Sequence, residues 1–215
     1  MKVDFHVHTT ASIDGFIAVA DLAKRSKKFG IIPALTDHNT GASWEKMKSA
    51  RVPFIAGEEI STTAGDFIGL FLTEAIPKKV SAEEAADRIK QQGGLSYLPH
   101  MYDRTRKGCG SKYADLADII EVFNARCLTP FNKQAEQTAA ALKKPRAAGS
   151  DSHFLFEFGS TYTSLPAFDL DNPKSLLKAL KSRAVKLTCQ PAPFYVRGTT
   201  WLLSKGKKMW RSVNG

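Results

Sequence analysis

Cysteine is scarce in this chain of 215 residues, which contains only Cys109, Cys127 and Cys189. Three isolated cysteines form neither the C-x-x-C pair of a thiolate zinc site nor a disulfide framework. We therefore expect reduced thiols and a cytoplasmic protein, because disulfides are rare in that compartment. The sequence also lacks the apolar run of roughly 20 residues that a membrane span requires. Its opening segment, MKVDFHVHTT, has no signal-peptide pattern.

Acidic residues are absent from the last part of the chain. Residues 172–215 contain ten lysines and arginines and no aspartate or glutamate, whereas residues 1–171 contain 21 basic and 21 acidic residues. The formal net charge of +10 therefore belongs to one end of the sequence. This distribution excludes a domain that is basic throughout, as many nucleic-acid-binding domains are. The hydrophobic content of 43% is ordinary for a folded domain and excludes low-complexity disorder.

We divide the chain into a barrel domain, residues 1–190, and a basic C-terminal extension that contains aromatic residues, residues 191–215. In the extension, Trp201 and Trp210 lie among lysines. Such a mixture can contact nucleic acid through phosphate attraction and base stacking. Weak contact with anionic lipid, or packing of residues 201–203 against the barrel with solvated lysines, are the alternatives.

Short apolar segments alternate with segments of helical periodicity. The predicted strands are residues 2–8, 31–37, 53–59, 67–72, 95–100, 119–124, 146–150 and 162–165, and the predicted helices are residues 19–29, 82–92, 132–144 and 173–183. This alternation predicts a mainly parallel sheet. The glycine-rich phosphate fingerprint of an open, doubly wound sheet is missing after the first strand, so we predict a closed α/β barrel.

All five histidines lie at the carboxyl ends of predicted strands: His6, His8, His38, His100 and His153. Side chains alternate along a strand, so the first two share a face. The carboxyl ends of parallel barrel strands converge on one rim, where barrel enzymes hold their active sites. Carboxylates accompany the histidines, and the mixture suits zinc, manganese or iron. Because the ligands are too many for one tetrahedral ion, we predict two or three divalent ions.

A metal cluster of this kind points to hydrolysis. Clustered divalent ions lower the pKa of bound water and stabilise charge on an oxygen of the substrate, which suits cleavage of a phosphate ester. Cleavage of an amide uses the same kind of site and stays open as an alternative.

Six segments carry a family resemblance: DFHVHTTASIDG (4–15), TDHNT (36–40), GEEIS (57–61), PH (99–100), EVFN (121–124) and GSDSH (149–153). Together they resemble the PHP family, named for the domain shared by bacterial replicative polymerases and histidinol phosphatases. The resemblance implies a distorted (β/α)7 barrel with a metal site at the carboxyl rim of its strands. It is strongest to the small stand-alone phosphoesterases of the family, which act on nucleotides or short RNA.

The resemblance also implies a set of metal ligands. One part of the cluster would comprise His6, His8, Glu59 and Asp151; a neighbouring ion would be held by Asp14, His38 and His153; and His100 would help to bind another. Within the pair of glutamates, the family pattern Gly-x-Glu selects the second, so Glu58 is predicted to point the other way.

Three further residues follow from the resemblance. Asp37 precedes a ligand and is predicted to orient it, and Asn124 is predicted either to line the site or to have a structural role. Many members of the family place another histidine in the strand after the glutamate motif. The aligned residue here is Gly69, which predicts a weaker or open metal position.

A basic loop follows the fourth histidine. Within it, Arg104 and Arg106 are predicted to bind phosphate oxygens, because guanidinium groups bind them in bidentate fashion. A solvated loop is the alternative. We therefore expect a metal-dependent phosphoesterase whose substrate is a phosphorylated nucleotide or short oligonucleotide. A non-catalytic nucleic-acid-binding or polymerase-accessory module, and an amide hydrolase, are the alternative functions.

Overall fold

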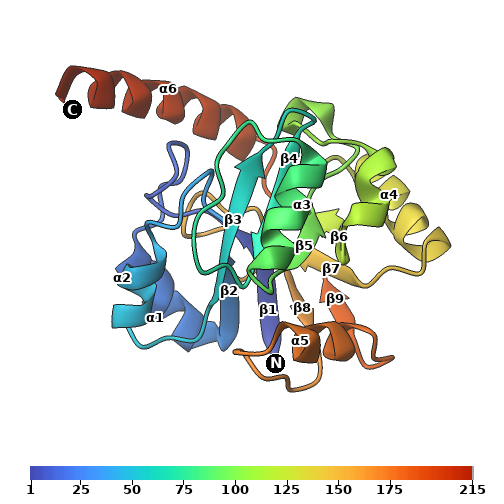
Figure 1. Cartoon of the computed structure of the whole chain (residues 1–215). Helices are drawn as coiled ribbons and strands as arrows, with labels where there is room; N and C mark the ends of the chain where they lie inside the picture. The colour runs from blue at the N-terminus through green and yellow to red at the C-terminus, as the bar shows by residue number, and fades with distance from the viewer. Residues whose placement is uncertain (215) are drawn as a thin grey trace.

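The computed structural model describes the backbone of residues 1–214 and the side chains of residues 1–210. Nine strands form one sheet in the order β7-β6-β5-β4-β3-β2-β1-β8-β9. They are β1 (Lys2–Val7), β2 (Ile31–Leu35), β3 (Ile55–Ser61), β4 (Asp66–Leu70), β5 (Leu95–Leu98), β6 (Ile119–Asn124), β7 (Arg146–Gly149), β8 (Tyr162–Ser164) and β9 (Lys186–Thr188). The sheet curls into a nearly closed barrel, and a single pairing of Val7 with Ser152 joins the segment after β7 to β1 (Figure 1). The predicted α/β barrel is confirmed.

The sheet differs from the prediction in strand direction. Within the described residues, β1–β2, β2–β3, β5–β6 and β6–β7 are parallel, but β3–β4, β4–β5, β1–β8 and β8–β9 are antiparallel. The tight turn between Ser61 and Asp66 causes the first reversal, because a short connection can join only antiparallel neighbours. Strand β4 therefore begins at the rim where β3 ends.

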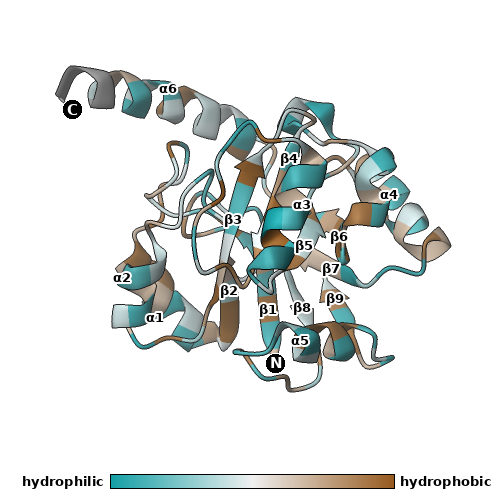
Figure 2. Ribbon diagram, viewed as in Figure 1, coloured by the Kyte–Doolittle hydropathy of each residue, from teal (hydrophilic) through white to brown (hydrophobic). Residues whose placement is uncertain are grey.

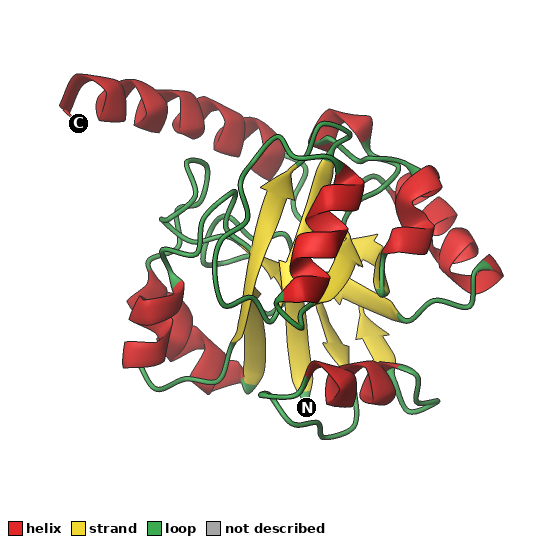
Figure 3. Cartoon of the chain, in the orientation of Figure 1, coloured by secondary structure: helices red, strands yellow, loops and turns green. Residues whose placement is uncertain are grey.

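Helices surround the barrel: α1 (Val19–Phe29), α2 (Trp44–Ser49), α3 (Ala82–Gln91), α4 (Thr129–Ala141), α5 (Pro173–Leu180) and α6 (Val196–Asn214), with short 3-10 turns η1 (Arg104–Arg106) and η2 (Ser111–Leu116) (Figure 3). Helix α1 ends at Gly30, whose φ of 63° is the left-handed conformation that glycine adopts readily. Helix α3 begins after Ser81, whose hydroxyl accepts a hydrogen bond from the Glu84 amide at 3.0 Å.

The barrel interior is apolar below and polar above. Phe5 and Tyr97 stack with ring centroids 5.8 Å apart, and Leu176 and Leu180 of α5 belong to the same buried cluster. Helix α5 thus covers the lower end of the barrel, whose strands are largely apolar in Figure 2. The opposite end holds the histidines and carboxylates.

Helix α6 crosses the top of the molecule and extends beyond it (Figure 1). Its residues Val196 and Thr200 are buried, whereas Trp201, Leu202 and Trp210 are more than half exposed. Although α6 is long, no helix in the described part of the chain is apolar enough to cross a membrane.

Candidate metal centre

Two histidines of β1 and its end form the middle of the site. The Nε2 atoms of His6 and His8 lie 3.1 Å apart, and both side chains are fully buried. The Glu59 carboxylate, from β3, lies 3.4 Å from the first and 3.3 Å from the second of these atoms. An Asp151 oxygen lies 3.8 and 3.5 Å from them. Four ligand atoms on three elements therefore face one small volume.

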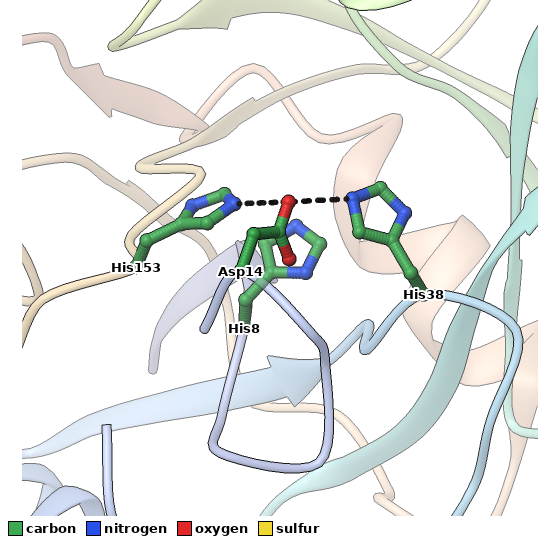
Figure 4. Close-up of side chains that lie close together, drawn as sticks. All are labelled: His8, Asp14, His38 and His153. Atoms are coloured by element: carbon green, nitrogen blue, oxygen red, sulfur yellow. Dashed lines mark ion pairs between the residues drawn. The ribbon is translucent and has the colours of Figure 1, made fainter. Parts of the chain in front are cut away.

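A second group adjoins the first through His8. The Asp14 carboxylate lies between two imidazoles and is 3.3 Å from the Nε2 atoms of both His38 and His153, as Figure 4 shows. Ligand atoms of these four residues all lie within 4.8 Å of one another. One residue from each of three loops and one from the end of β1 thus create a compact donor set.

His100 completes the set of eight predicted ligands. Its Nε2 lies 2.9 Å from a Glu59 oxygen, and it shares a group of ligand atoms with His6 and Asp151. His100 has a φ of 27° and Asp151 a φ of 51°, which are uncommon values for residues with a side chain. Strained backbone of this kind is concentrated at functional sites. The structure therefore brings all eight side chains together at one rim.

Asp66 is a ninth candidate, which the sequence analysis did not find. Ligand atoms of Asp66, His38 and Glu59 lie within 4.8 Å of one another, and the buried Oδ1 of Asp66 has no hydrogen-bond partner. Because β4 is antiparallel to β3, its first residue lies at the rim where the other ligands follow strand ends. The available signal was the Ala64–Gly65 turn, which reverses the chain just before this aspartate.

Gly69 does not face the site. A Cβ atom at this position would lie 2.9 Å from a Leu72 methyl group and 3.0 Å from Ile89, in the cluster between the sheet and α3. A side chain there would point away from the cluster. A histidine at residue 69 could not reach the metal ligands. The prediction that Gly69 leaves a weaker or open metal position is therefore wrong.

Glu121 of β6 orients two of the histidines. Its carboxylate lies 3.1 Å from Nδ1 of His6, accepts a hydrogen bond from the His100 amide at 2.8 Å, and accepts another from the Tyr97 hydroxyl at 3.1 Å. A hydrogen bond at Nδ1 fixes the ring and directs Nε2 toward the site. The carboxylate can approach because Gly149 is opposite: a Cβ there would lie 2.4 Å from Glu121.

Asp37 acts on the loop after β1. Its carboxylate accepts hydrogen bonds from the amide of Thr9 at 2.6 Å and from the hydroxyl of Ser12 at 3.0 Å. The Ser12 hydroxyl in turn lies 3.3 Å from Nδ1 of His8 and accepts from the His38 amide at 2.8 Å. Asp37 therefore holds the loop that orients both histidines.

Asn124 binds two carboxylates rather than lining the pocket. Its side-chain amide donates to Glu121 at 2.9 Å and to Asp151 at 3.0 Å.

Glu58 points away from the site, and its carboxylate accepts a hydrogen bond from the Ile76 amide at 2.7 Å. The two adjacent glutamates of β3 therefore lie on opposite faces of the sheet.

Charge in the cluster is balanced between acids and imidazoles. Burial would raise the pKa of Asp14, but its pairing with His153 and His38 lowers that pKa below its ordinary value. The pKa of Glu59 is likewise lowered, against the effect of burial, by His38 and His6. Burial opposes charge on His38, but Glu59 and Asp14 raise its pKa to about 10. The carboxylates are thus ionised and require compensating positive charge nearby.

Several ligand atoms make no hydrogen bond within the protein, although His38 Nδ1 and Asp151 Oδ1 lie within 3.5 Å of an ion-pair partner. Buried atoms without a hydrogen-bond partner include Asp14 Oδ1, His38 Nδ1, His100 Nδ1 and Asp151 Oδ1. Buried polar atoms are nearly always hydrogen-bonded, so a cluster of exceptions indicates a ligand. Bound divalent cations would satisfy these atoms and supply the positive charge that protonated imidazoles otherwise provide. The residues present therefore fit a metal centre.

A pocket of about 410 Å³ opens over the ligands. Its cationic lining residues are Arg106, Lys107, Arg126 and Arg197. Arg106 pairs with Asp151 at the bottom of the pocket. Arg104 is exposed and lines a separate depression beside residues 62–65, so the structure separates the two arginines that the sequence analysis paired.

The sequence is similar to known proteins along most of its length. Residues 129–185 match a family described as PHP-associated. The chain is 37% identical over 203 residues to uncharacterized protein MJ0417 of Methanocaldococcus jannaschii, and the alignment covers 87% of this chain and 82% of that protein.

Solved structures share the fold at low sequence identity. A Bifidobacterium adolescentis protein, provisionally designated a metal-dependent phosphoesterase, superposes with a TM-score of 0.58 at 16% identity, covering 71% of this chain and 87% of that one. The lesion-specific endonuclease Q of Pyrococcus furiosus superposes with a TM-score of 0.63 at 16% identity, covering 86% of this chain and 57% of the endonuclease. An endonuclease Q complex holds an abasic lesion of a 27-mer duplex at its active site and superposes with a TM-score of 0.55, with the same identity and coverage.

Proposed function

Because this chain belongs to the PHP family, we propose that it is a metal-dependent phosphoesterase that hydrolyses a phosphate ester of a nucleotide or short oligonucleotide. One observation carries the proposal: buried imidazoles and carboxylates with unpaired ligand atoms lie beneath a pocket lined by cations. Such a pocket suits an anionic substrate. The endonuclease Q structures, which have the same fold, favour a nucleic-acid-derived substrate.

The donor set would hold two or three divalent ions. One group consists of His6, His8 and Glu59; a second consists of His8, Asp14, His38 and His153; a third consists of His6, His100 and Asp151. Nitrogen and carboxylate donors together suit manganese, zinc or iron. When bound, such ions lower the pKa of water and offset negative charge on phosphoryl oxygens.

The chain's own cations would hold the phosphoryl group. Arg106 is fixed against Asp151, so its guanidinium is directed at the bottom of the pocket beside the ligands. Arg126 pairs with Glu157 at 2.6 Å, and Glu157 also accepts a hydrogen bond from the His153 amide at 3.0 Å. Arg106 would therefore bind a phosphate oxygen, whereas Arg126 positions the segment that carries His153.

Two adjacent glutamates provide a matched test. Glu59→Gln removes a ligand, and we expect it to lower kcat/KM for phosphate-ester hydrolysis by roughly 10³-fold, because several kcal/mol of metal-dependent stabilisation is lost. Glu58→Gln is the control, since Glu58 lies on the opposite sheet face and a glutamine can still accept from Ile76. Equal activity of Glu59→Gln and the wild type would contradict the proposal.

Parallel substrates separate the alternative functions. Metal-replete protein should release phosphate from a nucleotide or cleave a short oligonucleotide, and should leave an acyl amide intact. Faster cleavage of the amide would instead assign an amide hydrolase. Salt-sensitive nucleic-acid binding that survives chelation, without cleavage of any ester, would assign a non-catalytic module.

A further inference from the structure

Helix α6 is attached to the rim of the barrel by polar contacts along one face. Arg197 donates a hydrogen bond to the Thr105 hydroxyl at 2.5 Å, on the loop after β5. The Thr200 hydroxyl accepts from Arg126 at 3.0 Å, on the loop after β6. These contacts place the first turns of α6 directly beside the candidate metal centre.

A third contact reaches the loop that carries Asp14. The Lys207 ammonium donates to the carbonyl oxygens of Ser12 at 2.6 Å and Gly15 at 2.8 Å, and it lies 5.3 Å from the centre of the Phe16 ring. Helix α6 is therefore joined to loops from three different strands and spans the open end of the barrel.

The helix forms one wall of the pocket. We call this the α6 wall; its residues are Arg197, Thr200, Trp201 and Ser204. Opposite them are metal-ligand candidates, including Asp14 and His38. A phosphoryl group at the ligands would therefore leave the rest of its molecule facing α6.

The chemistry of the α6 wall differs from that of the pocket bottom. Trp201 presents a large aromatic ring that is 59% exposed, and the Lys205 ammonium lies over this ring, 3.7 Å from its centre. Arg197 adds a guanidinium, which lies 3.6 Å from the buried Asp103 carboxylate, and no acidic residue occurs in the chain after residue 171. An aromatic ring with flanking cations is the combination that stacks nucleobases and attracts their phosphates.

The pocket is also large enough for more than a phosphoryl group. Its volume of about 410 Å³ is within the range of sites that enclose a whole small molecule. Helix α6 leaves Trp201 exposed, although a tryptophan buried in the core would contribute more to stability. Trp201 is exposed where it lines the pocket, so a ligand in the pocket can contact its ring.

We propose that Trp201 is a specificity-determining residue that stacks on the base of a nucleotide substrate, with Arg197 supplying positive charge beside it. The inference rests on the proposed function and deepens it, because it assigns the base to the α6 wall and the reacting phosphate to the metal centre. The substrate class is therefore a nucleotide or oligonucleotide rather than a sugar phosphate.

Adenosine 5′-monophosphate and ribose 5-phosphate test this assignment, because the second carries a hydroxyl where the first carries the base. Trp201→Ala should weaken equilibrium binding of the nucleotide, and raise its KM, by about tenfold, because the variant loses the stacking of the base on the tryptophan ring. Binding of ribose 5-phosphate should stay within twofold of the wild type, and kcat should change little. Trp201→Phe should restore most of the loss.

Trp210→Ala is the matched control, because Trp210 lies on the same helix and does not line the pocket. It should bind both compounds as the wild type does. Equal losses for the two compounds in Trp201→Ala, or no loss for the nucleotide, would overturn the inference. Binding is measured in the presence of a chelator as well as with metal, so the role of Trp201 is tested even when neither compound is hydrolysed. Failure of the proposed function is recognised separately, by the absence of cleavage of any nucleotide or short oligonucleotide in the parallel substrate assay.

Discussion

The bottom of the pocket and its α6 wall are built in different ways. The bottom consists of buried imidazoles and carboxylates at strand ends, and His6, His8 and Asp151 are fully buried there. The wall is one face of a helix whose other faces are largely exposed. The strand ends fix the geometry of the metal ligands, whereas α6, which is attached by a few polar contacts, supplies the side chains that line the pocket above those ligands. Chemistry and selectivity are thus assigned to separate structural units.

This difference predicts separable effects. A change at the bottom should lower kcat and metal affinity together, because donor atoms lie within a few ångströms of one another. A change in the α6 wall should raise KM for the preferred substrate and leave the metal centre intact. Variants at each location therefore test whether the two units act separately.

After Glu59→Gln, the largest effect is expected at Asp66. Asp66→Asn should lower metal affinity by roughly 10- to 100-fold, the range seen when partners of a metal site are removed. Its buried carboxyl has a pKa raised by burial and by neighbouring Glu59, so a nearby cation would relieve an unfavourable arrangement. Isothermal titration calorimetry with the metal ion measures this change in metal affinity.

Gly69→Ala is the control for this variant. The added methyl group would meet Leu72 and Ile89, so it should lower the free energy of unfolding by about 1–3 kcal/mol through overpacking. Metal affinity should not change. Weaker metal binding in Gly69→Ala than in Asp66→Asn would contradict the assignment of Asp66 to the site.

A moderate effect is expected at Lys207. Lys207→Met removes hydrogen bonds to three carbonyl oxygens of the loop that carries Asp14, so α6 should be held less firmly over the pocket. We expect KM for a nucleotide to rise several-fold and the number of bound metal ions to stay the same. Loss of a metal ion in this variant would show that α6 supports the bottom of the pocket as well as the wall.

The smallest effect on metal binding and activity is expected at Glu58, on the far side of β3, where the expected change is in stability. Burial raises the pKa of Glu58 to about 7 in the folded protein, above its ordinary value of 4.5. The folded state therefore binds this proton more tightly, and stability should fall as pH rises from about 4.5 to 7. Glu58→Gln should remove this dependence, a difference of about 3 kcal/mol in the free energy of unfolding across that range, measured in denaturant titrations. An unchanged pH dependence would contradict the placement of this carboxyl.

The ligands were predictable because their positions follow a simple rule. Five histidines at strand ends, with His6 and His8 two residues apart, indicate one rim whatever the details of the loops. Asp66 was not predicted, because it lies at the start of an antiparallel strand and not at the carboxyl end of a parallel one. The direction of that strand depends on the turn before it. Gly69 was aligned with a family histidine, but only the sheet register shows which face it occupies.

Helix α6 was harder to predict. The segment contains Gly198 and Gly206, which lower helix propensity, and its apolar residues do not mark the face that packs on the barrel. Packing is instead made by Thr200 and Lys207 with Val196, contacts that exist only once three distant loops are in place. The basic charge of the segment was evident in the sequence, but its position over the pocket was not.

Metal titration of the chelator-treated protein tests directly whether phosphate-ester hydrolysis depends on bound metal. Phosphate-ester hydrolysis is followed while manganese, zinc or iron is added in measured equivalents. The account predicts no hydrolysis without metal and a rise that reaches its plateau at two or three ions per chain. Hydrolysis that persists in the chelator, or a rate independent of added metal, would contradict it.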